Sequence, residues 1–207
     1  NLYKIWNRLA SGTYFPPAVR EVEIPKKDGK MRKLGIPTIG DRIAQTVVKD
    51  YMETGIDKLF HENSYGYRPL KSAHQALEKA RQNVKQFDWV IDMDIKGFFD
   101  NISHRLILKA LDKVVKEKWV KMYCKRWLEM PIQKLDGTIL TKEGLGTPQG
   151  GVISPLLANL FLHYAFDVWM RRPSPQTPFA RYADDAVVHC KTESEARELR
   201  NAIVVRL

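Results

Sequence analysis

Two adjacent carboxylates stand between two short apolar runs near the carboxyl end of the chain. The runs extend from Phe179 to Tyr182 and from Ala186 to Cys190, and Asp184 and Asp185 lie between them. Short apolar runs separated by a polar turn indicate a β-hairpin. Two neighbouring anions repel each other, so one carboxyl pKa rises unless a cation neutralises the pair. The pair therefore predicts a metal at the hairpin tip. The alternative is a pair of ordinary turn residues, because Asp is common in turns.

A third carboxylate lies on a segment that alternates like a β-strand. One face of this strand carries Asp92 and Asp94 with Val90, and the other face carries Trp89, Ile91, Met93 and Ile95. If the strand lies beside the hairpin in one sheet, Asp94 at its end meets Asp184 and Asp185. Three such carboxylates suit two divalent ions that clamp an in-line phosphoryl displacement. Mg²⁺ is the expected metal because its ligands are oxygens, with Mn²⁺ as a substitute. Asp92 lies deeper in the strand and is expected to be structural.

Four sequence blocks, taken in order, carry a family resemblance. They are Ser64-Tyr65-Gly66-Tyr67-Arg68-Pro69, Asp94-Ile95-Lys96-Gly97-Phe98-Phe99-Asp100, Thr147-Pro148-Gln149-Gly150-Gly151 leading into Ser154-Pro155, and Tyr182-Ala183-Asp184-Asp185. Together they resemble the reverse transcriptase family, and the first block narrows the match to the group II intron-encoded type. The run from Gln149 to Asn159 also looks most like the intron group. The resemblance covers about Val19 to Cys190, and four ordered blocks are far more specific than one.

The resemblance implies an α+β fold, the fingers and palm of a right-hand polymerase, with an antiparallel palm sheet packed on helices. Residues 1–87 are expected to form the fingers and residues 88–207 a truncated palm, with residues 115–147 returning to the fingers. Members of the family continue into a thumb that grips the primer and template, and the thumb is expected to be absent here. The chain also begins at Asn1 rather than Met. It is therefore expected to be a fragment that extends a primer poorly or not at all by itself.

The resemblance also assigns roles at the reaction centre. It implies that Asp94, Asp184 and Asp185 are the catalytic residues and hold two magnesium ions, joined by the backbone carbonyl of Ile95. No side-chain nucleophile is needed, because the attacking group is the 3′-hydroxyl of a primer.

Further residues are expected to bind the incoming nucleotide. In the family an aromatic side chain packs beneath the deoxyribose and excludes a 2′-hydroxyl, and this role falls to Phe98 or Phe99 without a decision between them. Gln149 lies in a glycine-rich loop where backbone comes close to a ligand, and its amide can bond to a base or a sugar.

A cationic hairpin is expected near the amino end. Its strands, Val22 to Ile24 and Met31 to Ile36, flank a Lys-rich turn that contains Asp-Gly. In the functional interpretation this hairpin folds over the triphosphate, where Lys26 and Arg32 offset phosphate charge. The alternative is a solvated edge hairpin, since lysines commonly guard such edges. A second hairpin around Asp136-Gly137 is expected to belong with the fingers.

Helical spacing predicts two packed helices between these motifs. Asp41 is expected to N-cap the first, and Ser72 the second. The apolar side chains expected to face the core are Ile43, Val47, Val48, Tyr51 and Met52 in the first helix and Ala73, Leu77, Ala80 and Val84 in the second.

Charge and composition limit the partners. Lys and Arg number 34 against 24 Asp and Glu, which gives a net charge of +10, so the chain should attract a polyanion with salt-dependent affinity. Cys124 and Cys190 stand far apart, which favours neither a disulfide framework nor a zinc site. The sequence shows no membrane-spanning run and no signal peptide. A cytoplasmic, bacterial, nucleic-acid-associated protein is the expectation, and the oligomeric state stays open, a homodimer included.

The resemblance, taken with these patterns, implies an RNA-directed DNA polymerase domain of a group II intron-type protein, acting in intron mobility. Its partners would be an RNA template, intron RNA, a DNA primer and deoxynucleoside triphosphates, with no membrane. The alternative from a different class is a maturase module that binds intron RNA and assists splicing. Retron, diversity-generating and CRISPR-associated reverse transcriptases are the other hosts considered.

Overall fold

The chain divides into two compact units, each built from two separate stretches of sequence. The computed structural model describes residues 2–25, 29–141, 143–172 and 174–207. One unit comprises residues 1–54 and 97–157, and the other comprises residues 55–96 and 158–207. The predicted division into fingers (1–87) and palm (88–207) stays a prediction, because these units do not by themselves identify polymerase subdomains.

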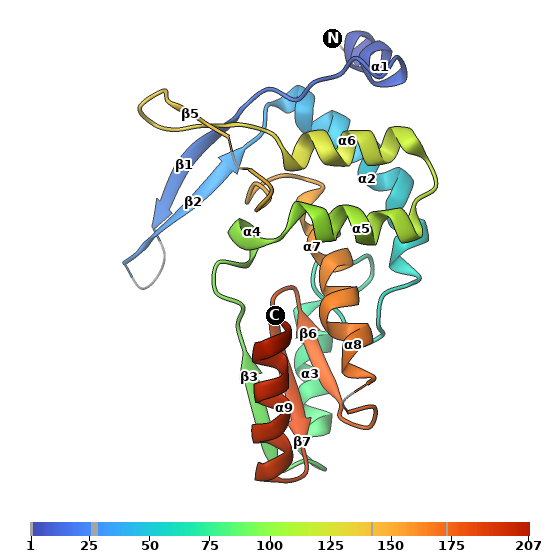
Figure 1. The fold of residues 1–207 in the computed structure, drawn as a ribbon, viewed down its shortest axis with the longest axis vertical. Coiled ribbons are helices and arrows are strands. Elements are labelled where there is room, and N and C mark those ends of the chain that lie inside the picture. The colour runs from blue at the N-terminus through green and yellow to red at the C-terminus, as the bar shows by residue number, and fades with distance from the viewer. Residues whose placement is uncertain (1, 26–28, 142, 173) are drawn as a thin grey trace. The chain divides into compact units, whose positions relative to one another are not determined.

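The first unit contains a four-stranded sheet and most of the amino-terminal helices. Its sheet has the order β2-β1-β4-β5, in which β1 pairs antiparallel with β2 and parallel with β4, and β4 pairs antiparallel with β5. Both predicted hairpins are therefore confirmed (Figure 1). The elements are α1 (Leu2–Ala10), β1 (Val19–Pro25), β2 (Met31–Ile36), α2 (Ile39–Asp57), α4 (Phe98–Asn101), α5 (His104–Val114), α6 (Lys118–Leu128), β4 (Ile132–Gln133) and β5 (Ile139–Leu140).

Asp41 is a buried acceptor and not the predicted N-cap. Helix α2 begins at Ile39, so Asp41 lies inside its first turn. Its carboxylate accepts hydrogen bonds from the hydroxyl of Tyr14 at 2.9 Å, from Nε1 of Trp127 at 2.8 Å and from Nε2 of Gln45 at 2.7 Å. These bonds satisfy a charge that would otherwise be costly to bury.

The predicted helix faces are correct only in part. In α2 the side chains of Val48 and Met52 are buried, whereas Val47 and Tyr51 are 52% and 54% exposed. Ser72 does cap α3 (Ala73–Asn83), through a complete capping box with Gln75. Periodicity located both helices, but only tertiary packing decided which part of each apolar stripe meets the core.

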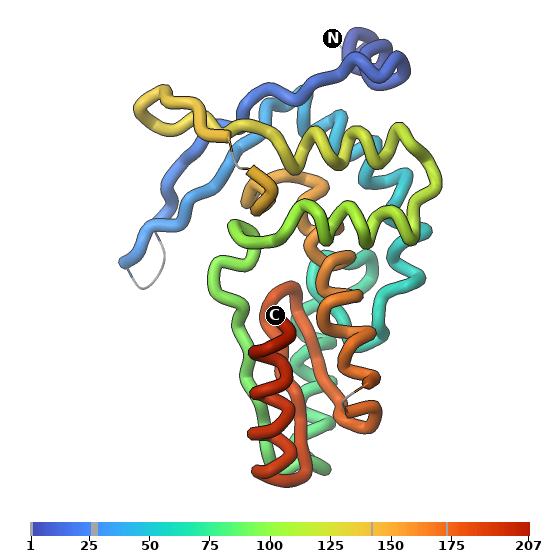
Figure 2. Tube along the Cα trace, viewed as in Figure 1, coloured from blue at the N-terminus to red at the C-terminus, as the bar shows by residue number. Residues whose placement is uncertain are grey.

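The second unit is a three-stranded antiparallel sheet with helices against it. The sheet order is β3-β7-β6. The remaining elements are β3 (Trp89–Met93), α7 (Ser154–Leu162), a π-helical turn (His163–Asp167), α8 (Val168–Met170), β6 (Phe179–Tyr182), β7 (Asp185–Cys190) and α9 (Glu193–Arg206). The tube view shows α9 in front of the strands and α3 behind them (Figure 2). The predicted α+β class with an antiparallel sheet on helices is confirmed.

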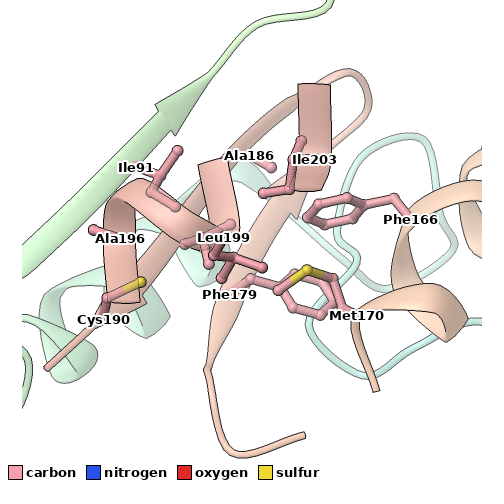
Figure 3. Close-up of a cluster of buried hydrophobic side chains, with 10 residues drawn as sticks. Ile91, Phe166, Met170, Phe179, Ala186, Cys190, Ala196, Leu199 and Ile203 are labelled. Carbon is pink, nitrogen blue, oxygen red and sulfur yellow. The ribbon is translucent and has the colours of Figure 1, made fainter. Parts of the chain in front are cut away.

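Alternate residues of the strands pack on opposite faces of this sheet. On the α9 side, a buried cluster joins strand residues to the helix and to the segment 166–170 (Figure 3). Its members are Ile91, Phe166, Met170, Phe179, Ala186, Val188, Cys190, Ala196, Leu199 and Ile203. On the other face Ala180 packs with Tyr65 and with Ala76 of α3. The two clusters place the apolar packing of this unit on either side of its strands.

None of the helices in the described ranges is both long enough and apolar enough to cross a bilayer.

Candidate active site

The β6–β7 hairpin presents one carboxylate, Asp184, on a strained two-residue turn and a second, Asp185, at the start of β7. Tyr182 pairs with Asp185, so that Ala183 and Asp184 form the turn between them. Ala183 has a φ of +58°, a conformation that usually falls to glycine at the first position of a type II′ turn. A left-handed backbone costs an L-residue about 1 kcal/mol. The turn therefore needs contacts from the rest of the unit to hold it.

Asp94 reaches the same end of the sheet from the neighbouring strand. Strands β3 and β7 pair antiparallel, and the last pair joins Met93 to Ala186. Continuing that register by one residue brings Asp94 beside Asp185. The predicted alternation along β3 is also observed, since Ile91 is buried while Asp92 and Asp94 are exposed.

The pKa of Asp185 is affected by the other acids at this end of the sheet. Its pKa is raised by partial burial and, after that, by the charges of Asp184, Asp94 and Asp92. The three predicted acids are therefore within electrostatic range of one another, and Asp92, expected to be structural, adds to the same negative field. A site made only of carboxylate oxygens suits a hard divalent cation. This donor set and the raised pKa both fit a metal.

The carboxylates are close but not gathered around one centre. Among the described residues, no group of three or more His, Cys, Asp or Glu side chains has the geometry to hold a metal ion. Ile95, whose carbonyl was predicted to join the ligands, lies just past the end of β3 and is half-buried.

The Ser64–Pro69 block packs along the hairpin. The segment around Ser64 forms a parallel bridge with Arg181, and the amide of Tyr65 donates to the carbonyl of Arg181 at 2.8 Å. Asn159 on α7 donates to the carbonyl of Gly66 at 2.6 Å. Arg68 is occupied by Asp57, with its Nε 2.7 Å from the carboxylate. The Ser64–Pro69 block is thus a structural support for β6.

Arg181 is the functional candidate that the sequence analysis missed. It is fully buried in β6 and donates to the backbone carbonyl of Ala183 at 2.8 Å. A lone cation in an otherwise apolar strand is unusual, since charged residues are rarely buried without partners. That pattern was the signal available in the sequence.

In the other unit, two of the predicted nucleotide-binding residues meet. Nε of Arg32 donates to Oε1 of Gln149 at 2.9 Å, and the amide of Gln149 lies 3.5 Å from a carboxylate oxygen of Asp100. The carbonyl of Gln149 also accepts from the amide of Gly35 at 2.7 Å. Lys26 lies outside the described residues.

Phe98 and Phe99 are both buried in that unit. They are 5% and 8% exposed, and their rings meet edge to face with centroids 5.5 Å apart. Burial does not distinguish them, so the choice of the sugar-facing ring stays open.

Carboxylates near one end of a sheet are the kind of ligand that two-metal phosphoryl transfer uses. A family model described as "Reverse transcriptase (RNA-dependent DNA polymerase)" matches residues 24–207, and the chain belongs to this family.

A relative within this family is a group II intron-encoded protein, the type that the sequence predicted. The chain is 38% identical over 161 residues to the group II intron-encoded protein LtrA of Lactococcus lactis subsp. cremoris, an alignment that covers 77% of this chain and 26% of LtrA. The chain therefore spans about a quarter of the length of that relative. The predicted resemblance to the group II intron type is confirmed.

Solved structures agree with the fold. The chain is 27% identical to a chain of a partial Cas6-RT-Cas1–Cas2 complex, with a TM-score of 0.56 over 97% of this chain and 34% of that one. Telomerase from Candida albicans has a TM-score of 0.67 at 11% identity, over 91% of this chain and 39% of that one, which supports the fold alone. The predicted reverse-transcriptase fold class is confirmed by these likenesses.

Proposed function

We propose that this chain is the nucleotidyl-transfer part of an RNA-directed DNA polymerase, which adds deoxynucleotides to a primer 3′-hydroxyl on an RNA template. The observation that carries the proposal is the acidic cluster at the end of the β3-β7-β6 sheet, where the strand register brings Asp94 beside Asp185, next to Asp184. A chain of this family with a charged cluster at that edge has the ligands that phosphoryl transfer needs.

The residues proposed to hold two Mg²⁺ ions are Asp94, Asp184 and Asp185, with the carbonyl of Ile95. When bound, such ions lower the pKa of the attacking hydroxyl and offset negative charge on the triphosphate. Mn²⁺ is proposed as a substitute because it accepts similar oxygen ligands.

The first unit is proposed to bind the nucleotide. Arg32 is held by Gln149 at 2.9 Å, so the two side chains would meet a nucleotide together and orient its phosphates and sugar. Lys26 is proposed to add charge on the phosphates. One of Phe98 and Phe99 is proposed to limit the space beneath the sugar.

The proposed partners are an RNA template, a DNA primer and deoxynucleoside triphosphates. A net charge of +10 supports binding to a polyanion, and the affinity should fall as salt rises. The predicted cytoplasmic location and oligomeric state stay predictions.

A second candidate function is maturase activity, in which the protein binds intron RNA and assists splicing. It is supported by the likeness to a protein named as group II intron-encoded. The two functions are separable, because binding of intron RNA does not need the acidic cluster. Asp184→Ala should abolish primer extension and leave intron RNA binding within about twofold of wild type, as expected for a surface change away from phosphate contacts. Loss of both activities together would contradict separable roles.

Metal binding by the 207-residue chain tests the principal proposal without requiring catalysis. Mn²⁺ titrations followed by electron paramagnetic resonance would compare wild type with Asp94→Asn and Asp184→Asn. The control is Asp88→Asn, which makes the same charge change on an exposed residue just before β3. We expect the first two variants to weaken Mn²⁺ binding at least about tenfold, since each removes a proposed ligand, and the control to match wild type.

Primer extension on an RNA template, by the protein expressed from its complete gene, tests the reaction itself. The same Asp94→Asn and Asp184→Asn changes should reduce extension to background with Mg²⁺, while Asp88→Asn should extend like wild type. Equal extension by wild type and Asp94→Asn would refute the assignment of Asp94.

A further inference from the structure

Arg181 is a buried cation whose hydrogen-bonding capacity is completely used. An arginine side chain has five N–H donors. Nε and Nη2 donate to the two carboxylate oxygens of Asp167 at 2.8 and 2.7 Å. Nη1 donates to Oδ1 of Asn159 at 3.1 Å and to the carbonyl of Ala183 at 2.8 Å, and Nη2 also donates to the hydroxyl of Ser64 at 2.8 Å.

We propose that Arg181 is a positioning residue that fixes the Ala183-Asp184 turn, and through it the two carboxylates proposed as metal ligands. The inference rests on the proposed function of that turn. Arg181 does not touch the reacting atoms. It acts through the carbonyl of Ala183, which immediately precedes Asp184.

Charge compensation alone does not explain the arrangement. Asp167 is fully buried, and its bidentate contact already neutralises the guanidinium. The remaining bonds go to Ser64, Asn159 and Ala183, which come from three separate segments of the unit. The guanidinium therefore ties the turn to the supporting block at Ser64 and to α7.

The local backbone explains why the turn needs such a tie. Ala183 holds a left-handed φ of +58° without the freedom of glycine. A carbonyl fixed by a buried donor resists relaxation of that turn. Asp167 is the last residue of the π-helical turn, and its neighbour Phe166 packs in the apolar cluster. Such π-helical insertions are frequent at functional sites.

Lysine cannot reproduce this arrangement. The lysine ammonium is a compact charge on a flexible side chain. The planar guanidinium, in contrast, bonds to a carboxylate and to the turn at the same time in one fixed geometry. Arg181→Lys should therefore keep the charge and lose the fixed position of the turn.

The test measures the Mn²⁺ affinity of the 207-residue chain at a temperature at which circular dichroism shows that each variant is folded. We expect Arg181→Lys to weaken Mn²⁺ binding by about tenfold, the usual effect of removing a group that orients a ligand. In primer extension by the protein from its complete gene, the variant should need more Mn²⁺ and recover much of its rate at saturating metal. The control is Leu199→Ala, which also removes buried contacts but lies on α9 away from the turn. It should lower the melting temperature and leave Mn²⁺ affinity unchanged.

A second variant separates positioning from folding where Arg181→Lys does not fold. Replacing a buried ion pair by apolar side chains of similar size often preserves stability. The double variant Arg181→Met, Asp167→Leu should fold and still bind Mn²⁺ about tenfold more weakly, because the carbonyl of Ala183 has lost its donor. Mn²⁺ affinity equal to wild type in a folded variant would overturn the inference.

Comparing Asp184→Asn with the Arg181 variants distinguishes failure of this inference from failure of the proposed function. If Asp184→Asn binds Mn²⁺ as tightly as wild type, the proposed metal site is wrong, and the role of Arg181 fails with it. If Asp184→Asn loses the metal while the Arg181 variants keep it, only the role of Arg181 is wrong.

Discussion

Gly66 lies directly against the backbone of Ala183. A methyl group on Gly66 would stand 2.3 Å from the backbone nitrogen of Ala183 and 3.1 Å from its Cα. Asn159 holds the Gly66 carbonyl at 2.6 Å, so the segment cannot easily withdraw. Position 66 therefore admits only glycine while the turn keeps its conformation, and this contact links the Ser64–Pro69 block to the acidic hairpin.

Gly66→Ala should displace the turn or strain its support. We expect a loss of about 1–3 kcal/mol in the free energy of unfolding, as for overpacking elsewhere. Urea denaturation and Mn²⁺ titration of the same samples provide the measurements. The control is Gly55→Ala in α2, where a methyl group meets nothing within 4 Å. It should be neutral or slightly stabilising, and a Gly66→Ala protein that matched it in both measurements would contradict the close contact.

Asp167→Asn should make the protein less stable at neutral pH and less sensitive to acid. Burial alone would raise the pKa of Asp167, but the charge and hydrogen bonds of Arg181 outweigh burial and hold that pKa below its ordinary value. A carboxyl whose folded pKa is lowered stabilises the fold above its unfolded pKa of about 3.9 and loses that effect as pH falls through the folded value.

The expected cost of Asp167→Asn at pH 7 is about 3–5 kcal/mol, because Arg181 would be left buried without its anion. The gap between variant and wild type should narrow below about pH 4. Urea denaturation across this pH range measures both effects. Asp88→Asn, an exposed change of the same kind, should show neither, and a gap that stayed constant with pH would show that Asp167 is not charged in the folded protein.

One of Phe98→Ala and Phe99→Ala should relax the choice between deoxyribonucleotides and ribonucleotides. Both rings are buried, so each truncation should lower the free energy of unfolding by about 3–5 kcal/mol. Only the ring beneath the sugar should also raise ribonucleotide incorporation in primer extension by the protein from its complete gene. The ratio of ribonucleotide to deoxyribonucleotide incorporation identifies that ring, and an unchanged ratio in both variants would remove the proposed role from this pair.

Cys124 and Cys190 should report separately on the two units. Burial raises the pKa of the Cys124 thiol to about 12, and burial together with the charge of Glu195 raises that of Cys190 to about 11. Since the thiolate is the reactive form, iodoacetamide at pH 8 should modify neither residue in the native protein and both in urea.

Peptide mass spectrometry can follow the two labels with increasing urea. Cys124 lies on α6 of the first unit and Cys190 on β7 of the second, so different midpoints would reveal independent unfolding. Labelling of Cys190 in the native protein at the rate of a free thiol would contradict its burial.

Local patterns were sufficient for the elements around the site. Two apolar runs with a polar turn predicted the β6–β7 hairpin, alternation predicted β3, and Ser72 predicted the start of α3, because each depends on residues close together in sequence. The same reasoning failed at Asp41. An acid at the start of a helix has the pattern of a cap, and only the buried donors of Tyr14 and Trp127 distinguish it from one.

The sequence by itself determined the family, the order of the motifs and the three acids proposed to bind metal, since those follow from residue type and spacing. Tertiary structure alone decided what holds these acids in place. Asp167 and Gly66 are distant in sequence from the turn. The contact of Asp167 with Arg181 and that of Gly66 with Ala183 arise only when the π-helical turn and the Ser64–Pro69 block pack against β6. A buried guanidinium is tolerable only where all its donors find acceptors, and no local pattern can show that they do.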